Sequence, residues 1–183
     1  MKAGYHHGDL RRAILDAAVE AIGSSGVDGW SMRELARRAG VSHAAPAHHF
    51  RDKAGLFTAL AAEAFDLLAD ELEGSGDDFL ETGLAYVAFA VAHPVHFEVM
   101  FQRTLYRPDD PAVQEAEQRA ATVLARGAHL AAAGDPDQRS VALAGWSIAH
   151  GFASLWLGGA LDFPADADPV AQARPVLSRL LPE

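Results

Sequence analysis

The sequence predicts an all-α fold of about nine helices, and three observations support this fold class. Apolar residues recur every three or four positions along nearly the whole chain of 183 residues, which is the spacing of one buried helix face. Signals for helix starts and helix ends separate these apolar segments. No segment of useful length alternates apolar and polar residues as a half-buried strand would.

The first predicted helix carries an apolar stripe that runs from Leu10 to Ile22 with helical spacing. Glycine and serine residues at 23–26 end this helix. The next helix begins at a capping box, in which the side chains of Ser31 and Glu34 each satisfy a backbone N–H group of the other residue.

A short third helix and a long fourth helix follow. Gly40 ends the second helix after about two turns. Ser42 is placed to cap the third helix, and Asp52 is placed to cap a long helix that continues to about Glu73. A domain boundary is expected within this long helix.

The later helices are marked mainly by prolines. A helix is expected from Phe79 to His93, where Pro94 ends it, and a short segment follows from 96 to about 104. The last three helix starts share one signature, an aspartate as N-cap directly before a proline at the first helical position. These pairs are Asp110-Pro111, Asp135-Pro136 and Asp168-Pro169.

The N-terminal order of helix, short helix, glycine turn and short helix is the layout of a helix-turn-helix. Ala36 is the small residue that lets the two short helices meet. The second short helix would enter the major groove of DNA, with its N-terminal residues nearest the base edges. In the next helix, an ammonium and the helix N-terminus would together hold a phosphate. The residues expected to contact DNA are Arg33, Ser42, His43, Ala44, Ala45, His48, His49 and Lys53.

Three stretches of this region resemble the N-terminal domain of TetR-type transcriptional regulators. They are residues 5–15 (YHHGDLRRAIL), 31–42 (SMRELARRAGVS) and 49–56 (HFRDKAGL). The resemblance implies a homodimer that binds a palindrome-like operator in double-stranded DNA. It also implies two domains, a helix-turn-helix DNA-binding domain at 1–55 and a helical effector-binding and dimerisation domain at 56–183.

Two positions depart from the pattern of that family. Ala47 stands where the family usually has a tyrosine that holds a backbone phosphate, and Pro46 precedes it. The proline lacks an N–H group and disfavours a helical conformation at the residue before it. The recognition helix is therefore expected to be short or distorted, which leaves the two following histidines or Lys53 to contact the phosphate.

A C-terminal motif resembles the Trp-x3-His-Gly (WHG) subgroup of TetR-type regulators. It lies at residues 146–151 (WSIAHG), and residues 93–101 also resemble that subgroup. Trp146 and His150 lie one turn apart on one helix face, and Gly151 would let another element approach closely. The resemblance implies a pocket for a small hydrophobic effector, although the same residues would also suit a simple helical core. The candidate ligand-binding residues are Phe89, Phe97, Met100, Phe101, Trp146 and His150.

Small residues on the helix expected from Asp135 to about Leu161 favour a close contact between helices. The last predicted helix is amphipathic and could pack beside it. In TetR-type proteins the last two helices of each subunit form a four-helix dimer interface, and these two segments fit that role. The candidate interface residues are Ala142, Ala149, Ala153, Ala160, Val176 and Leu180.

The net charge of −10 is unevenly distributed along the chain. Residues 1–60 contain eight Lys and Arg against six acidic residues, whereas residues 61–183 contain seven against nineteen. The first segment is therefore +2 and the second −12, and only the first has the sign expected for contact with nucleic acid.

No catalytic, metal or cofactor site is predicted. The chain has no cysteine, and the histidines at 43, 48 and 49 are poorly spaced for metal binding on one helix face. It also lacks a Gly-x-Ser-x-Gly elbow, a phosphate-binding loop and a His-Glu-x-x-His motif. Without a signal-peptide core or a long apolar run, the expectation is a cytoplasmic protein that does not bind a membrane.

The sequence thus predicts a ligand-responsive transcriptional regulator, and the family resemblance favours a repressor that a small hydrophobic effector releases from DNA. The alternative is a DNA-binding dimer without an effector, whose C-terminal domain only dimerises or contacts another protein. Activation also stays open, because the sign of regulation depends on where the operator lies relative to a promoter.

Overall fold

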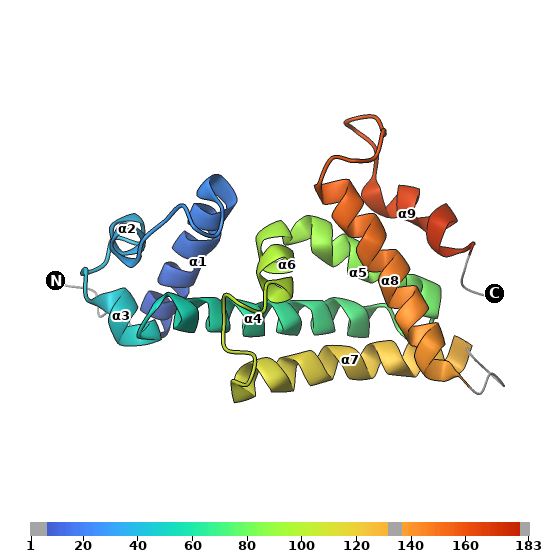
Figure 1. Ribbon diagram of the computed structural model, residues 1–183, viewed down its shortest axis with the longest axis horizontal. Helices are drawn as coiled ribbons and strands as arrows, with labels where there is room; N and C mark the ends of the chain where they lie inside the picture. Colours follow the sequence, from blue (N-terminus) through green and yellow to red (C-terminus); the bar gives the residue numbers. More distant parts are fainter. Residues whose placement is uncertain (1–6, 132–136, 180–183) are drawn as a thin grey trace. The chain divides into compact units, whose positions relative to one another are not determined.

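The computed structural model describes residues 7–131 and 137–179, and this part of the chain forms nine α-helices and no strand (Figure 1). The predicted all-α fold is confirmed. The helices are α1 (His7–Ser25), α2 (Met32–Arg38), α3 (Ala45–Phe50), α4 (Lys53–Gly74), α5 (Phe79–Ala92), α6 (Pro94–Phe101), α7 (Pro111–Ala131), α8 (Gln138–Leu157) and α9 (Pro169–Leu177).

The helices belong to two compact units. The first unit comprises the chain up to Glu63 together with Val95–Gln114. The second unit comprises Ala64–Pro94 and the chain from Glu115 onward. The segment that contains α6 therefore packs with the N-terminal helices, and each unit has its own buried core.

In the first unit, α1 packs against α2 and α3 through its predicted apolar stripe. Ile14, Ala18 and Ala21 are fully buried, whereas Leu10 at the start of the stripe is only half-buried. Helix α1 ends where Gly26 takes a φ of 73°, a left-handed conformation that glycine adopts without steric cost.

Helix α2 begins at the predicted cap. The Ser31 hydroxyl accepts a hydrogen bond from the Glu34 N–H at 3.2 Å. The Glu34 carboxylate accepts hydrogen bonds from Arg38, one turn later, at 2.7 and 2.9 Å. Gly40 ends this segment with a φ of 66°, and the completely buried Leu35 anchors the helix to the core.

The prediction that Ser42 caps α3 is wrong. The helix begins at Ala45, and its N-cap is Ala44, which makes no side-chain capping bond. Pro46 fixes this start, because a proline is accommodated in the first turn, where its missing N–H group would have no helical partner. The Ser42 carbonyl instead accepts the Ala45 N–H at 3.0 Å in the preceding turn. With six residues, α3 is short, as predicted.

A tight turn centred on Arg51 joins α3 to α4. Arg51 has φ 68° and ψ −58°, and the Asp52 N–H donates to the Phe50 carbonyl at 2.8 Å, the geometry of a γ-turn. A Cβ atom at Gly55 would lie 2.0 Å from the Phe50 carbonyl oxygen, so only glycine fits there. The Asp52 carboxylate caps α4, as predicted, by accepting the Gly55 N–H at 2.7 Å.

In the second unit, α5 packs against both α8 and α9 (Figure 1). Glycines permit this close packing. A Cβ atom at Gly145 would lie 2.5 Å from the Phe79 ring, and one at Gly83 would lie 2.8 Å from the side chain of Leu177. Phe89 on α5 is fully buried.

The predicted aspartate caps are confirmed at two of the three helix starts. Asp110 accepts the N–H of residue 112 at 3.1 Å, and Asp168 accepts that of residue 170 at 3.0 Å. Asp135 lies outside the described residues. The described part of α8 begins after Asp137, which caps it by accepting the Ser140 N–H at 3.1 Å. Helix α8 ends at Leu157, earlier than predicted, because glycines follow it directly.

Candidate DNA-binding face and sensor residues

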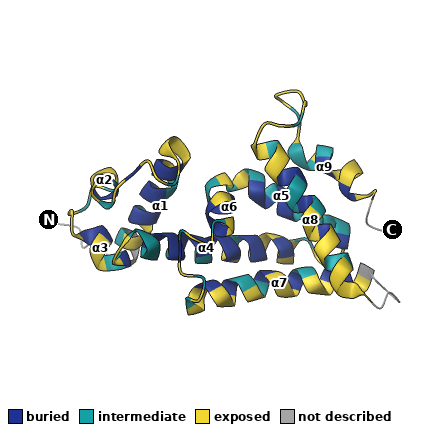
Figure 2. Ribbon diagram, viewed as in Figure 1, coloured by how far each residue is buried: buried dark blue, intermediate teal, exposed yellow. Residues whose placement is uncertain are grey.

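Most of the predicted DNA contacts lie on the outer surface of the helix-turn-helix (Figure 2). Arg33, Ser42, His43, Ala44 and His48 are exposed. Two further candidates, at positions 49 and 53, are half-buried.

Ala45 differs from these candidates because it is only 7% exposed. Its methyl group packs inside the first unit, as does Pro46 beside it. The outer surface of α3 therefore presents the small side chain of Ala47 and the imidazole of His48. This surface lets a helix approach DNA bases closely but offers few hydrogen-bonding groups to read them.

Lys53 lies at the first position of α4. Its Nζ atom is 4.4 Å from the centre of the Trp30 ring, 5.7 Å from the centre of the Phe57 ring and 3.9 Å from a carboxylate oxygen of Asp28. The sequence analysis did not single out these three neighbours. One local signal was present for Trp30, because it stands directly before the N-cap Ser31, where an apolar residue often packs against the new helix.

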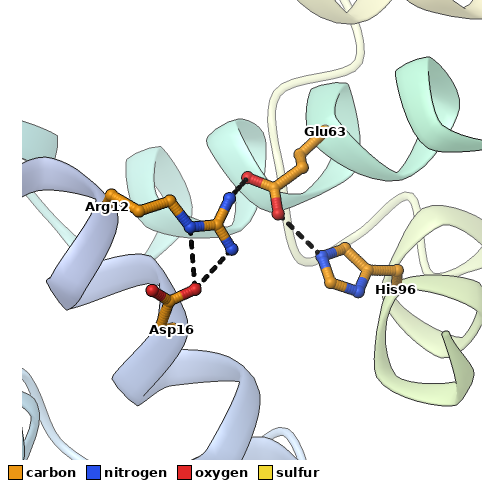
Figure 3. A network of polar contacts seen from close by, with 4 residues as sticks. All are labelled: Arg12, Asp16, Glu63 and His96. Atoms are coloured by element: carbon orange, nitrogen blue, oxygen red, sulfur yellow. Dashed lines mark hydrogen bonds and ion pairs between the residues drawn. The ribbon is translucent and has the colours of Figure 1, made fainter. Parts of the chain in front are cut away.

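A polar network joins three helices of the first unit (Figure 3). Arg12 on α1 donates to Asp16 and, at 2.8 Å, to Glu63 on α4. The other oxygen of Glu63 accepts from Nε2 of His96 on α6 at 3.1 Å. Burial opposes the charged form of Glu63, but the hydrogen bonds from His96 and Arg12 outweigh it and lower the pKa of Glu63.

The loop after α6 is tied to the start of α4. The Arg107 guanidinium donates two hydrogen bonds to Asp52, at 2.7 and 2.9 Å, and its backbone N–H donates to the Thr58 hydroxyl at 3.1 Å. The pKa of Asp52 is lowered, first by the Gly55 N–H and then by Arg107. Because Asp52 already occupies this Gly55 N–H, a bound phosphate would depend more on Lys53 than on the helix terminus.

The six candidate ligand-binding residues are divided equally between the two units. In the first unit, Phe97 and Met100 are buried and Phe101 is 36% exposed, with the two phenylalanine rings in edge contact at 5.3 Å. The other three candidates, Phe89, Trp146 and His150, belong to the second unit.

Sequence analysis missed Tyr86, which connects two of the candidates in the second unit. The Trp146 Nε1–H donates to the Tyr86 hydroxyl at 3.4 Å, and that hydroxyl lies 2.9 Å from Nδ1 of His150. Burial raises the pKa of Tyr86 and lowers the pKa of His150, so both side chains are favoured in their neutral forms. In a neutral imidazole one ring nitrogen donates and the other accepts, so either Tyr86 or His150 can be the donor of this bond.

Gly151 does not play its predicted packing role within the described chain. A Cβ atom at this position would meet no other atom of the described residues within 4 Å, apart from its chain neighbours and its own helix backbone. No element of the described chain makes the close approach that Gly151 would permit, and on α8 that approach occurs at Gly145 instead.

The candidate interface residues differ in burial. Ala149 and Ala153 are buried inside the second unit, Ala142 is half-buried, and Ala160 and Val176 are exposed. Leu180 lies outside the described residues. Two of the six candidate interface residues, Ala149 and Ala153, are thus enclosed by their own chain.

A different set of large apolar side chains on α8 is uncovered. Leu143 is 54% exposed and Leu155 is 49% exposed, and Trp146 and Leu157 are also exposed. Helix α8 is long and apolar enough to cross a membrane by length and composition. A helix that packs inside a protein core passes the same test.

Comparisons with known proteins identify the family. Residues 79–174 match the family described as "Tetracyclin repressor-like, C-terminal domain", and residues 14–60 match "Bacterial regulatory proteins, tetR family". The chain belongs to the TetR family. Proteins of this family are DNA-binding transcriptional regulators rather than enzymes.

Similar proteins match almost the full length of the chain. The HTH-type transcriptional regulator BetI of Escherichia coli O45:K1 (strain S88) is 27% identical over 180 residues, which cover 89% of this chain and 88% of BetI. A protein of unknown function from Rhodococcus sp. RHA1 has a structure with a TM-score of 0.79, 36% identity, and coverage of 98% of this chain and 99% of its own. The putative regulatory protein SCO4313 gives a TM-score of 0.76 at 27% identity, with coverage of 95% and 96%.

Proposed function

We propose that this TetR-family protein is a ligand-responsive repressor that binds a palindrome-like operator as a homodimer in the cytoplasm. A small hydrophobic effector, bound in the C-terminal domain, would release it from DNA. The observation that carries the proposal is the exposed face of α2 and α3, in a helix-turn-helix whose family binds DNA. This face includes Arg33 on α2 and His48 on α3, and the exposed His43 lies in the turn between the two helices. We keep the boundary between the two functional domains at residues 55 and 56.

The proposed dimer uses the uncovered side of α8 together with α9. Leu143, Leu155 and Val176 are between 42% and 54% exposed on two helices that are in contact, and a patch of exposed apolar residues is typical of an interaction site. A twofold dimer would bury them and place two recognition helices on successive major-groove faces of one duplex. The exposed Ala160 stays a candidate for this interface. The buried Ala149 and Ala153 would not contact the partner and instead pack within their own unit, on the same helix α8.

The proposed effector site includes Tyr86, His150 and Trp146, and we assign the chain to the WHG subgroup on this basis. Their hydrogen bonds form a short chain that connects α5 with α8. A few polar groups among aromatic side chains are typical of small-molecule sites. Effector binding would favour a conformation with lower operator affinity, a reciprocal coupling of about 1–3 kcal/mol.

Selection from a pool of random DNA duplexes, followed by sequencing, tests the DNA-binding proposal. We expect enrichment of a palindrome-like site, with affinity that falls steeply as salt rises, because bound phosphates release counterions. Failure of the wild-type protein to bind any duplex at low salt would contradict the proposed function. Enrichment of a site without twofold symmetry would contradict the dimeric mode alone.

One observation favours a second candidate, a DNA-binding dimer without an effector. Phe89, one of the candidate pocket residues of the second unit, is fully buried, so it already fills the core of that unit. An effector screen with the selected operator separates the two candidates. Release from DNA by a hydrophobic compound, lost in Tyr86→Phe and His150→Ala, supports the sensor. A compound that binds the protein but leaves operator affinity unchanged counts against it.

A further inference from the structure

Two aromatic rings, those of Trp30 and Phe57, lie against the ammonium of Lys53 at the start of α4, and we call this pair the aromatic seat. The Trp30 and Phe57 rings meet edge to face, with their centres 5.5 Å apart. Lys53 Nζ lies over both rings, closer to Trp30 at 4.4 Å than to Phe57 at 5.7 Å. A cation within about 6 Å of a ring centre is attracted by the negative face of the ring, and tryptophan attracts it most strongly.

The N–H group of Trp30 does not explain why a tryptophan stands there. Trp30 is only 6% exposed, and its buried Nε1 atom has no hydrogen-bond partner among the described residues. An unpaired buried donor is unfavourable, and a leucine or methionine would avoid it. Compared with leucine or methionine, tryptophan adds an aromatic ring face at this position. The Lys53 ammonium lies over that face.

The choice of lysine is equally specific in this chain. Of its fifteen Lys and Arg residues, only Lys2 and Lys53 are lysines. A compact ammonium can rest on a ring with one side and still present N–H groups on the other, whereas a guanidinium would stack flat. The Lys53 side chain is 37% exposed, so part of it faces solvent next to α3.

We propose that Trp30 is a positioning residue for DNA binding, which together with Phe57 holds the Lys53 ammonium ready for a backbone phosphate. This inference rests on the proposed DNA-binding function. A free lysine loses rotamer freedom when it binds a phosphate. Lys53 has already lost part of this freedom on its aromatic seat, so less affinity is lost when the phosphate arrives.

The test measures binding of the full chain to short fluorescent duplexes of random sequence at low salt, where phosphate contacts dominate. Lys53→Met removes the charge and keeps the apolar stem, and we expect the slope of log affinity against log salt to shrink by about 0.9. Trp30→Leu removes the ring face, with an expected loss of about three- to tenfold in affinity. Trp30→Phe keeps a ring and should lose less than the leucine variant.

The decisive comparison is the double variant. If Trp30 acts through Lys53, Trp30→Leu weakens binding in the wild-type background and has no further effect in the Lys53→Met background. An equal loss in both backgrounds would overturn the inference and leave Trp30 a purely structural residue. Wild-type protein that binds no duplex would instead contradict the proposed function.

A second measurement does not depend on DNA or on how stable the leucine variant is. Proton NMR of the wild-type protein should show the ε-methylene protons of Lys53 shifted upfield by the ring current, and only one other lysine, Lys2, complicates the assignment. Trp30→Phe should keep a reduced shift. A Lys53 signal at the position of a solvent-exposed lysine in the wild type would overturn the inference.

Discussion

The two compact units expose different kinds of side chain. Of the eight large hydrophobic residues exposed in the described chain, only Phe101 lies in the first unit, and the other seven lie in the second. The first unit instead exposes polar, charged and small residues on α2 and α3. This difference indicates which partner each unit can accept, a polyanion for the first and an apolar surface for the second.

The charge distribution sharpens this comparison. The first unit contains ten Lys and Arg against ten acidic residues and is neutral overall, whereas the second contains five against fifteen and is −10. The acidic helices of the second unit are held by arginines such as Arg119, which contacts Asp70 and Glu73 at 2.6 and 2.7 Å. Those ion pairs are solvent-exposed and contribute little to stability. Stability there depends more on buried apolar contacts, which include the glycine-mediated packing of α5 against α8 and α9.

The largest effect is expected from a charge on the apolar side of α8. Burial of one leucine contributes about 1.5–3 kcal/mol, so Leu143→Glu should weaken the dimer by at least about tenfold. Analytical ultracentrifugation over a range of concentrations measures this change. Ala121→Glu, at an exposed position of α7, is the matched control. A dimer that tolerates the charge at position 143 would place the interface elsewhere.

Glycine packing in the second unit is tested by two substitutions on one helix. In Gly145→Ala the new methyl group meets the Phe79 ring, which cannot retreat easily because Gly127 lies on another side of it. We expect a loss of about 1–2 kcal/mol in the free energy of unfolding. Gly151→Ala meets open space and should gain about 0.5–1 kcal/mol from helix propensity.

Chemical denaturation of both variants measures these opposite effects. If Gly151→Ala is also destabilising, another element, such as a partner subunit, must approach this glycine after all. If Gly145→Ala leaves the free energy of unfolding unchanged, the close packing of α5 and α8 is not what stabilises the second unit.

In the first unit, the network around Glu63 should make stability depend on acid pH. Because the pKa of Glu63 is lowered on folding, its stabilising contribution is present above the carboxyl pKa of the unfolded chain, about 4.3, and is lost as pH falls through the folded pKa. Thermal melts of the wild type at pH 7 and near pH 3.5 should show this loss.

Glu63→Gln is expected to lower stability at pH 7 by about 1–2 kcal/mol, since its bonds to Arg12 and His96 lose their charge. It should also show a smaller difference between the two pH values than the wild type. Asp16→Asn, which removes only the exposed partner of Arg12, is the control. Equal pH dependence in the wild type and Glu63→Gln would mean that other carboxylates dominate.

Local signals in the sequence predicted much of the fold but little of this network. The caps at Ser31 and Asp52 were predictable because an N-cap bonds to an N–H group three residues later. The exception was Ser42, where Pro46 displaced the helix start. Helix-turn-helix residues were placed by the same short-range patterns and by family resemblance.

Contacts between distant parts of the chain were not predictable in this way. Glu63 and His96 are 33 positions apart, and Tyr86 and His150 are 64 apart. Periodicity shows which residues share a helix face but not what covers that face. For this reason periodicity could not show that Ala149 and Ala153, two of the candidate interface residues, face the core of their own unit.

The smallest expected effect concerns Asp28, whose carboxylate is 96% exposed and 3.9 Å from Lys53 Nζ. An exposed ion pair contributes little to folding, but this carboxylate competes with a phosphate for the ammonium. Asp28→Asn should therefore tighten binding to random duplexes by about twofold at low salt, and salt should screen the gain away. Asp166→Asn is the control, because it removes one negative charge from the second unit instead of the first. If both variants tighten binding equally, the effect is one of net charge, whereas a gain confined to position 28 indicates that the phosphate and Asp28 compete for one lysine.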